Sequence, residues 1–192
     1  MSEYKNTVIV SAFPACGKTY LFRNQDKLLF NYLGEKIHFS FCDSDSSKYE
    51  KTEDWIKRYV DDIEKKCGTI DFLFISQHQE VLKELEVRGI PFVVVAPNNS
   101  DWISDDERRI IKQQWFGRFI LRDNSHIKDF PSWLKLLKDK YDEWTSIESL
   151  TKYNPESLVL LNQDQYIKDI IEELYWTKET YASTYCLCRY GE

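Results

Sequence analysis

A strand–loop–helix unit near the N-terminus constrains the fold of this chain more than any other stretch. Residues 7–10 are a short run of β-branched, mostly apolar side chains, which is typical of a buried strand. Gly17-Lys18-Thr19 begins a helical segment after a loop of the length found in the phosphate-binding P-loop, Gly-x-x-x-x-Gly-Lys-[Ser/Thr]. Such a loop surrounds nucleotide phosphates with backbone N–H groups and the positive end of a helix. The sequence therefore predicts a nucleotide-phosphate site here.

Each residue of this motif has an expected role. Gly17 lets the backbone approach a phosphate closely, Lys18 reaches the β- and γ-phosphate oxygens, and the Thr19 hydroxyl can bind Mg²⁺. Ala12 replaces the first glycine of the pattern, and the alternative interpretation is a chance Gly-Lys-Thr at a helix start. The flanking strand and helix favour the P-loop. The residues expected to bind ATP are Phe13, Pro14, Ala15, Cys16, Gly17, Lys18, Thr19 and Tyr20.

The length of 192 residues predicts one domain, residues 1–192, with a helical lid and insertion at about 100–150. The formal net charge of −6 argues against a protein that coats a nucleic acid polymer, so bound phosphate needs a local cluster of positive charge. Five cysteines without a Cys-x-x-Cys pair indicate reduced thiols, and Cys186-x-Cys188 is not expected to bind a metal. No signal peptide or membrane span is visible, which predicts a cytoplasmic protein; the oligomeric state stays open.

Strand and helix patterns alternate along the chain. This rhythm predicts an α/β fold with a five-stranded parallel sheet and right-handed crossovers, in a three-layer α/β/α arrangement with a helical lid. Ligands of such sheets bind at the carboxyl ends of the strands. The expected strands are residues 7–10, 36–42, 70–75, 92–96 and 157–161. The expected helices are residues 20–33, 52–66, 80–87, 104–122, 130–144 and 163–175, and a break in the first of them near residues 24–26 is left open.

Asp43-Ser44-Asp45 follows the second expected strand, which we place beside the P-loop. Asp43 could orient the hydration shell of Mg²⁺, and Asp45 could bind an acceptor hydroxyl or act as a base. Ser46 is a further candidate for acceptor binding. The alternative is an acidic turn whose side chains bond their own backbone. The spacing after a P-loop favours the metal and acceptor roles.

Arginines of the expected helix at residues 104–122 are candidates for catalysis. Arg118 and Arg122 are four residues apart and so share one helix face. Guanidinium groups supplied from a lid stabilise the charge that develops in phosphoryl transfer. The alternative is a solvated helix face in which basic side chains pair with acidic neighbours, and we expect this for Arg108 and Lys112.

Candidates for binding the acceptor occur in two places. One is the segment after the third expected strand, and the other is the start of the expected helix at 52–66. His78 could bind an acceptor phosphate or base, although a histidine at a helix start is often only a polar cap. One basic side chain near the start of that helix could hold an acceptor phosphate, and the sequence leaves open which one. These candidates are Lys48, Lys51, Lys57 and Arg58.

These motifs together resemble the nucleoside monophosphate kinases of the P-loop kinase superfamily, and most closely the small nucleotide kinase-like proteins encoded by bacteriophages of Gram-positive hosts. In that family Ser-Ala-Phe-Pro-x-x-Gly-Lys-[Ser/Thr] is followed by Asp-Ser-Asp-Ser-Ser-Lys, as at residues 11–19 and 43–48. The likeness extends to residues 72–78 and to Arg118-x-x-x-Arg122. Shikimate kinase, a more distant relative, has an Asp-x-Asp pair that serves the metal and an acceptor hydroxyl.

The resemblance implies an ATP- and Mg²⁺-dependent phosphotransferase acting on a (deoxy)nucleoside monophosphate, in the host cytoplasm if the chain is phage-encoded. Adenylate kinase-type enzymes carry Asp-Gly-Phe-Pro-Arg after the third strand, and this chain has Ser76-Gln77-His78 there, which makes Asp43 the expected organiser of the metal. Two alternatives stay open. One is a kinase of a small hydroxyl-bearing metabolite with Asp45 as base, and the other is a nucleotide-binding P-loop protein without turnover.

Overall fold

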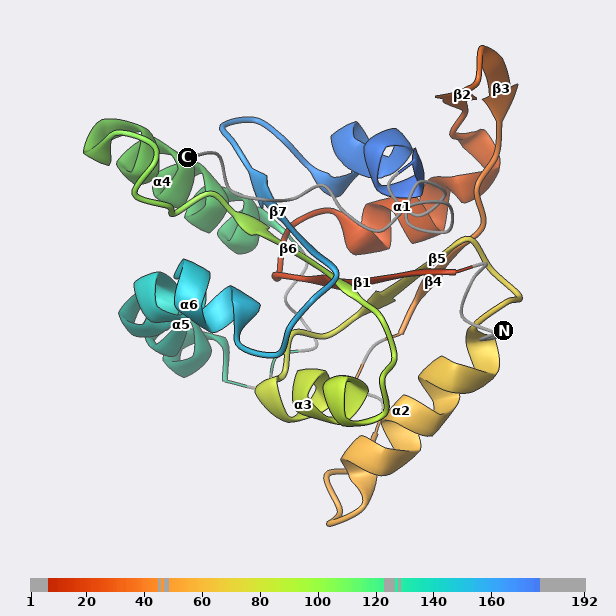
Figure 1. The fold of residues 1–192 in the computed structure, drawn as a ribbon. Helices are drawn as coiled ribbons and strands as arrows, with labels where there is room; N and C mark the ends of the chain where they lie inside the picture. The colour runs from red at the N-terminus through yellow and green to blue at the C-terminus, as the bar shows by residue number, and fades with distance from the viewer. Residues whose placement is uncertain (1–6, 45, 47–48, 123–126, 128, 177–192) are drawn as a thin grey trace.

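A parallel five-stranded sheet forms the centre of the computed structural model, which describes residues 7–44, 46, 49–122, 127 and 129–176 (Figure 1). Every neighbouring pair of strands in this sheet runs parallel, so the predicted α/β class and the parallel sheet are confirmed. In spatial order the strands are β4 (Phe41–Asp43), β5 (Phe72–Ile75), β1 (Val8–Ala12), β6 (Val93–Pro97) and β7 (Ser157–Leu161).

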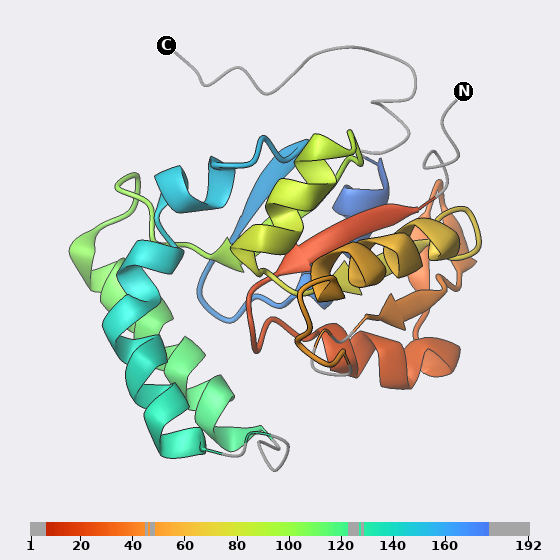
Figure 2. The same ribbon diagram turned by 90° about the horizontal axis from the view of Figure 1, so that it is seen from below.

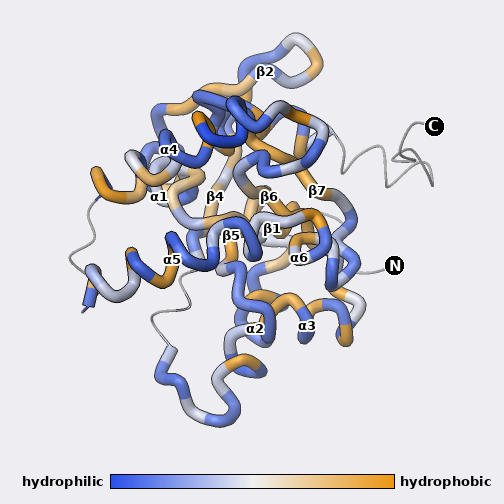
Figure 3. Tube along the Cα trace, turned by 90° about the vertical axis from the view of Figure 1, so that its left-hand side faces the viewer, coloured by the Kyte–Doolittle hydropathy of each residue, from blue (hydrophilic) through white to orange (hydrophobic). Residues whose placement is uncertain are grey.

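Helices cover both faces of the sheet. In Figure 1, α2 (Trp55–Lys66) and α3 (Gln79–Val87) lie on one face, and α1 (Lys18–Asn24) and the helical residues 171–176 lie on the other. Every residue of β1, β5 and β6 is buried, as expected for strands covered on both faces. Figure 3 shows these hydrophobic strands enclosed by more hydrophilic helices. The arrangement is consistent with three α/β/α layers.

The central strand β1 directs the chain toward the site. Val10 of β1 lies opposite Phe74 of β5 on one side and Val93 of β6 on the other. The chain leaves β1 toward β4 at one edge of the sheet, whereas it leaves β6 toward β7 at the other edge. Connections that diverge in this way open a crevice outside the carboxyl ends of the strands. The loop after β1 lies at this crevice.

Three helices occupy the region expected to be a helical insertion at about 100–150. They are α4 (Asp105–Leu121), α5 (Phe130–Trp144) and the short α6 (Ile147–Thr151), which the sequence patterns did not predict. Figures 1 and 2 show α4 and α5 beyond the carboxyl ends of the strands, as a pair that projects from the sheet. We call α4 and α5 the helical pair. No helix in the described part of the chain is long and apolar enough to cross a bilayer.

Buried and partly buried aromatic rings hold the helical pair together. The rings of Trp115 and Tyr141 have centroids 5.6 Å apart, and those of Phe119 and Trp133 stack at 4.8 Å. Ring pairs at these distances add to the free energy gained from burying their apolar surface. The outer face of α4 carries the ion pairs expected from the sequence, because Arg108 contacts Asp105.

The predicted helix at residues 20–33 is wrong in its second half. The chain forms a 3₁₀ turn at Gln25–Lys27 and then an antiparallel hairpin of β2 (Phe30–Tyr32) and β3 (Glu35–Ile37). Leu33 and Gly34 both have positive φ, 51° and 85°, as a two-residue hairpin turn requires. Tertiary packing overrides the helical spacing, since the buried ring of Phe30 lies 6.0 Å from that of Phe41.

The predicted strand at residues 36–42 is also wrong, because it is divided between β3 and β4. At the break, the backbone N–H and the hydroxyl of Ser40 donate to Asp71 Oδ2 over 2.8 and 2.7 Å. The Asp71 side chain thus holds the break, while the Ser40 carbonyl still accepts from the Phe72 N–H of β5 over 3.0 Å. The predicted last helix at 163–175 is correct only in its second part, with a 3₁₀ turn at Ile167–Ile170 and α-helical residues 171–176.

Candidate functional site

The loop after β1 turns later than the sequence pattern indicated. Ala12 is fully buried and still pairs with Val95 of β6, so no turn is needed where the P-loop pattern has its first glycine. Positive φ values occur at Ala15 (63°) and Gly17 (102°), just before α1. A side chain at position 17 would meet the Tyr166 ring at 3.5 Å in a strained backbone conformation. Glycine is therefore required there.

The Lys18 ammonium group lies at the base of the loop. It donates to the backbone carbonyl of Ala12 and, over 3.5 Å, to that of Ile75. These carbonyls mark the carboxyl ends of β1 and β5, so the positive charge is held at the rim of the sheet. This is the place where the P-loop pattern requires a cation for the phosphate oxygens.

Two loop residues expected to bind ATP have buried side chains. Phe13 and Cys16 are buried, and the Phe13 ring lies 4.7 Å from that of Trp115 and 6.2 Å from that of Tyr141. Burial raises the pKa of the Cys16 thiol to about 11. These two residues can contribute only backbone groups to a nucleotide site. Their side chains instead attach the loop to the helical pair.

Thr19 and Asp43 meet although their elements are far apart in sequence. The Thr19 hydroxyl donates to Asp43 Oδ2 over 2.7 Å. The strand that carries Asp43 is not the neighbour of β1 in the sheet, because β5 lies between β4 and β1. Thr19 nevertheless reaches the end of β4, because α1 packs against that strand.

Thr19 and Asp43 fit the coordination chemistry of Mg²⁺. This ion takes oxygen ligands, usually one or two protein side chains completed by substrate phosphates and water. Among the residues that the structure describes, no group of three or more His, Cys, Asp and Glu side chains could hold a metal on its own. A Mg²⁺ ion held by Thr19 and Asp43 would take its remaining ligands from water or from phosphate oxygens.

A broad cleft brings the separate predicted residues together between the rim of the sheet and the helical pair. Its volume is about 1640 Å³, larger than the roughly 300–1,000 Å³ of a site for one small ligand. A donor and an acceptor could both fit. Its lining includes Lys18, Asp43, Ser46, His78, Arg118 and Arg122. Asp45, Lys48, His126, Cys186 and Cys188 lie outside the described residues.

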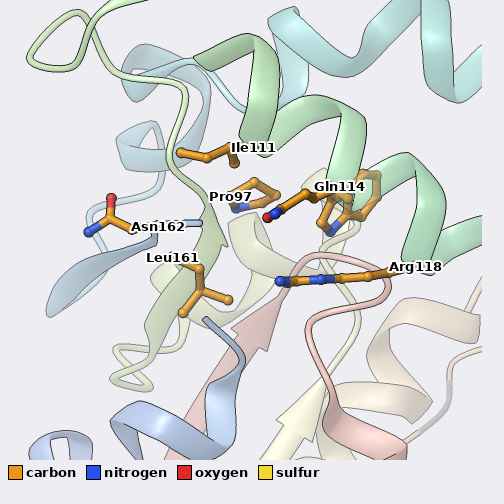
Figure 4. Close-up of a pocket in the computed structure, with 7 residues that line it drawn as sticks. Pro97, Ile111, Gln114, Arg118, Leu161 and Asn162 are labelled. Atoms are coloured by element: carbon orange, nitrogen blue, oxygen red, sulfur yellow. The ribbon is translucent and has the colours of Figure 1, made fainter. Parts of the chain in front are cut away.

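Arg118 is fixed close to the loop after β1. Its Nη1 donates to the Gln165 carbonyl over 2.7 Å, and its Cζ lies 3.9 Å from the centre of the Tyr166 ring. Tyr166 in turn covers Gly17. Figure 4 shows Arg118 extending from α4 toward Leu161, beside a small cavity of about 10 Å³. That volume is enough for about one water molecule.

Arg122 follows the last residue of α4 and also lines the cleft. Its Cζ lies 4.2 Å from the centre of the Phe119 ring, and burial lowers the pKa of its guanidinium group. Arg118 and Arg122 therefore face the same cleft. Lys112, by contrast, forms an ion pair at 2.7 Å with Asp142 of α5, a partner on the other helix of the pair in place of the expected acidic neighbour on α4.

Sequence reasoning missed the segment after β7 that supports Arg118. Gln114 of α4 donates to Asp164 Oδ1 over 3.1 Å and accepts from the Asp164 backbone N–H over 3.2 Å. The N–H of Ile167 donates to the Cys16 carbonyl over 3.0 Å. This segment thus connects α4 to the P-loop. The sequence did not predict this connection, because the apolar spacing of residues 163–175 indicates one continuous helix.

A second support that the sequence did not indicate is Tyr59 of α2. Its buried hydroxyl donates to the Ser44 carbonyl over 2.6 Å and accepts from the Ser76 N–H over 3.2 Å. These two backbone groups follow directly after β4 and β5. Tyr59 therefore fixes the spacing of the two rim segments that carry Asp43 and His78.

Comparison of the chain with protein-family models, with characterised proteins and with solved structures finds no match. The functional interpretation therefore depends on the residues of the cleft and their contacts.

Proposed function

We propose that this chain is an ATP- and Mg²⁺-dependent phosphotransferase that acts on a (deoxy)nucleoside monophosphate. The observation that carries the proposal is the 2.7 Å hydrogen bond between Thr19 and Asp43. It joins the last position of a P-loop motif to a carboxylate at the rim of the sheet, as a Mg²⁺-nucleotide site requires. A lone phosphate-binding loop would need no carboxylate there.

The cleft residues divide the proposed reaction between them. Lys18 would bind the β- and γ-phosphate oxygens of ATP, and Thr19 with Asp43 would hold the metal. When bound, Mg²⁺ neutralises charge on these phosphate oxygens. Arg118 and Arg122 would stabilise the negative charge that spreads over the transferred group. Asp45, which lies outside the described residues, is proposed from its place in the sequence to bind the acceptor.

The helical pair would serve as the lid of this site. It carries both arginines, and its inner face lines the cleft. Because Phe13 packs against Trp115 and Tyr141, the lid would be attached to the P-loop at its base. Any water that the helical pair excludes from the cleft would strengthen the electrostatic interactions inside it.

We expect Asp43→Asn to weaken the response to Mg²⁺ more than it weakens ATP binding. Altering a group that orients a metal ligand costs roughly 10- to 100-fold in metal affinity or activity. The measurement is turnover against Mg²⁺ concentration, alongside ATP binding by calorimetry. Asp26→Asn, which changes an exposed carboxylate near the end of α1, is the matched control. If Asp43→Asn leaves the metal response unchanged, the carboxylate only hydrogen-bonds Thr19.

Measuring ATP consumption by the wild type with different acceptors separates the proposed function from its two alternatives. A kinase of a hydroxyl-bearing metabolite would consume ATP with sugars or other alcohols but not with nucleoside monophosphates. A nucleotide-binding protein without turnover would bind Mg²⁺-ATP and consume none with any acceptor.

A further inference from the structure

Three side chains form a cluster on the side of the cleft that belongs to α2 and β5. Lys51 Nζ lies 3.2 Å from the centre of the Trp55 ring and donates to the Ser46 carbonyl over 3.2 Å. The His78 ring is 5.7 Å from that of Trp55 and almost perpendicular to it, at 84°. Ser46 and His78 both line the cleft. An ammonium group and an imidazole are thus held beside the cleft by one indole.

His78 is not used as a helix cap, which was the alternative interpretation of its position. It precedes the first residue of α3, but its side chain makes no capping hydrogen bond. Burial lowers the pKa of the imidazole, the charges of Lys51 and Lys18 lower it further, and Glu80 opposes them. Positive charge therefore predominates around this solvent-accessible imidazole, and an anion placed beside it would favour its protonated form.

The structure also distinguishes among the basic residues that could hold an acceptor phosphate. Arg58 forms an ion pair with Asp54 at 3.2 Å and donates to the Thr52 hydroxyl over 2.5 Å, and it does not line the cleft. Lys57 is an exposed side chain of α2. Lys51 alone among these described candidates is bonded to a residue of the cleft lining.

We infer that Lys51 and His78, held by Trp55, form a subsite for the anionic phosphate group of the acceptor. The inference rests on the proposed function and specifies how that same site selects its substrate. Lys51 supplies a fixed charge, and His78 supplies an N–H donor and can take up a proton when a dianion binds. The subsite favours a nucleoside monophosphate over the corresponding nucleoside.

The first test compares binding of dAMP, dGMP, dCMP and dTMP, of the four matching nucleosides and of inorganic phosphate, by calorimetry. Lys51→Ala should weaken binding of the preferred monophosphate by about 10-fold or more, because it removes a charge-assisted hydrogen bond. ATP and nucleoside affinities should not change. Lys57→Ala, an exposed lysine of the same region, is the matched control and should change nothing.

The second test uses pH. A bound dianion raises the pKa of His78, so binding takes up a proton, and affinity should fall as pH rises through the window between the pKa values of the free and bound protein. Lys51, Lys18 and Glu80 are the charged groups acting on the imidazole. The phosphate itself titrates near pH 6, but equally for wild type and His78→Gln. Dividing the monophosphate affinity of the wild type by that of His78→Gln at each pH therefore leaves only the contribution of the imidazole. This ratio should approach a constant above neutral pH.

Three results would overturn the subsite. They are equal affinity for a nucleoside and its monophosphate, no binding of any monophosphate or of inorganic phosphate, and unchanged monophosphate affinity in both Lys51→Ala and His78→Gln. Failure of the proposed function is distinguishable, because it would appear as loss of ATP binding or of turnover in the wild type. A protein that binds monophosphates through Lys51 but transfers no phosphoryl group would retain the subsite and lose the proposed reaction.

Discussion

Replacing Arg118 by alanine should slow phosphoryl transfer by about a thousandfold and change ATP affinity only modestly. A cation that stabilises the transferred group acts mainly in the transition state, so its removal lowers turnover and not ground-state binding. Arg118 is the better placed of the two lid arginines, because the Gln165 carbonyl and the Tyr166 ring hold it beside Gly17. The measurement is steady-state turnover with ATP binding determined by calorimetry.

Arg109→Ala is the matched control, since Arg109 lies on the exposed face of α4 and pairs with Asp106 at 2.8 Å. Its turnover should equal that of the wild type. Arg118→Lys should restore little activity, because lysine lacks the planar two-pronged donor of a guanidinium group. Arg122→Ala should also lower turnover. Wild-type rates in both alanine variants would reduce these arginines to surface charges.

Replacing Lys18 by alanine should remove most of the thermal stabilisation that Mg²⁺-ATP gives the wild type. A ligand at ~100 times its dissociation constant contributes roughly 2.7 kcal/mol. For a chain of this size that corresponds to an increase in Tm of about 5 to 10 °C. Lys18 carries the charge at the base of the loop, where it is bonded to the carbonyls of Ala12 and Ile75.

The control for this comparison is Lys27→Ala, which removes an exposed lysine just after α1. Its stabilisation by Mg²⁺-ATP should match that of the wild type. Because Lys18→Ala also removes hydrogen bonds in the free protein, each variant is compared with and without nucleotide, and only the difference is interpreted. An unchanged Tm of the wild type in saturating Mg²⁺-ATP would contradict the P-loop assignment.

Much of the sheet could be predicted from the sequence, because the runs at residues 70–75 and 92–96 are buried on both faces and have few polar side chains. The turn into α1 could be predicted for a different reason, since Gly17 has the positive φ that favours glycine at this position. Its geometry depends on local chemistry at Gly17, Lys18 and Thr19, which neighbouring residues in the sequence determine. The charged face of α4 followed from the spacing of its own acidic and basic residues.

The features that the sequence did not reveal depend on contacts between distant residues. The Asp71 side chain binds Ser40 where the predicted strand is interrupted. A hydrogen bond to a residue 31 positions away cannot be predicted from the local sequence. The segment at residues 162–166 is fixed by α4 and the P-loop, although its composition suggested a helix. Thr19 meets Asp43 because α1 packs against β4, although β5 separates β4 from β1, and motif spacing alone does not give this strand order.

Transfer of label from γ-labelled ATP to deoxynucleoside monophosphates tests the proposed phosphotransferase most directly. Purified wild-type protein is incubated with and without Mg²⁺, and the products are separated by chromatography. A labelled nucleoside diphosphate should form only when ATP, Mg²⁺ and a monophosphate are all present, and Lys18→Ala should form none. Binding of Mg²⁺-ATP without transfer of label to any monophosphate would contradict the proposal.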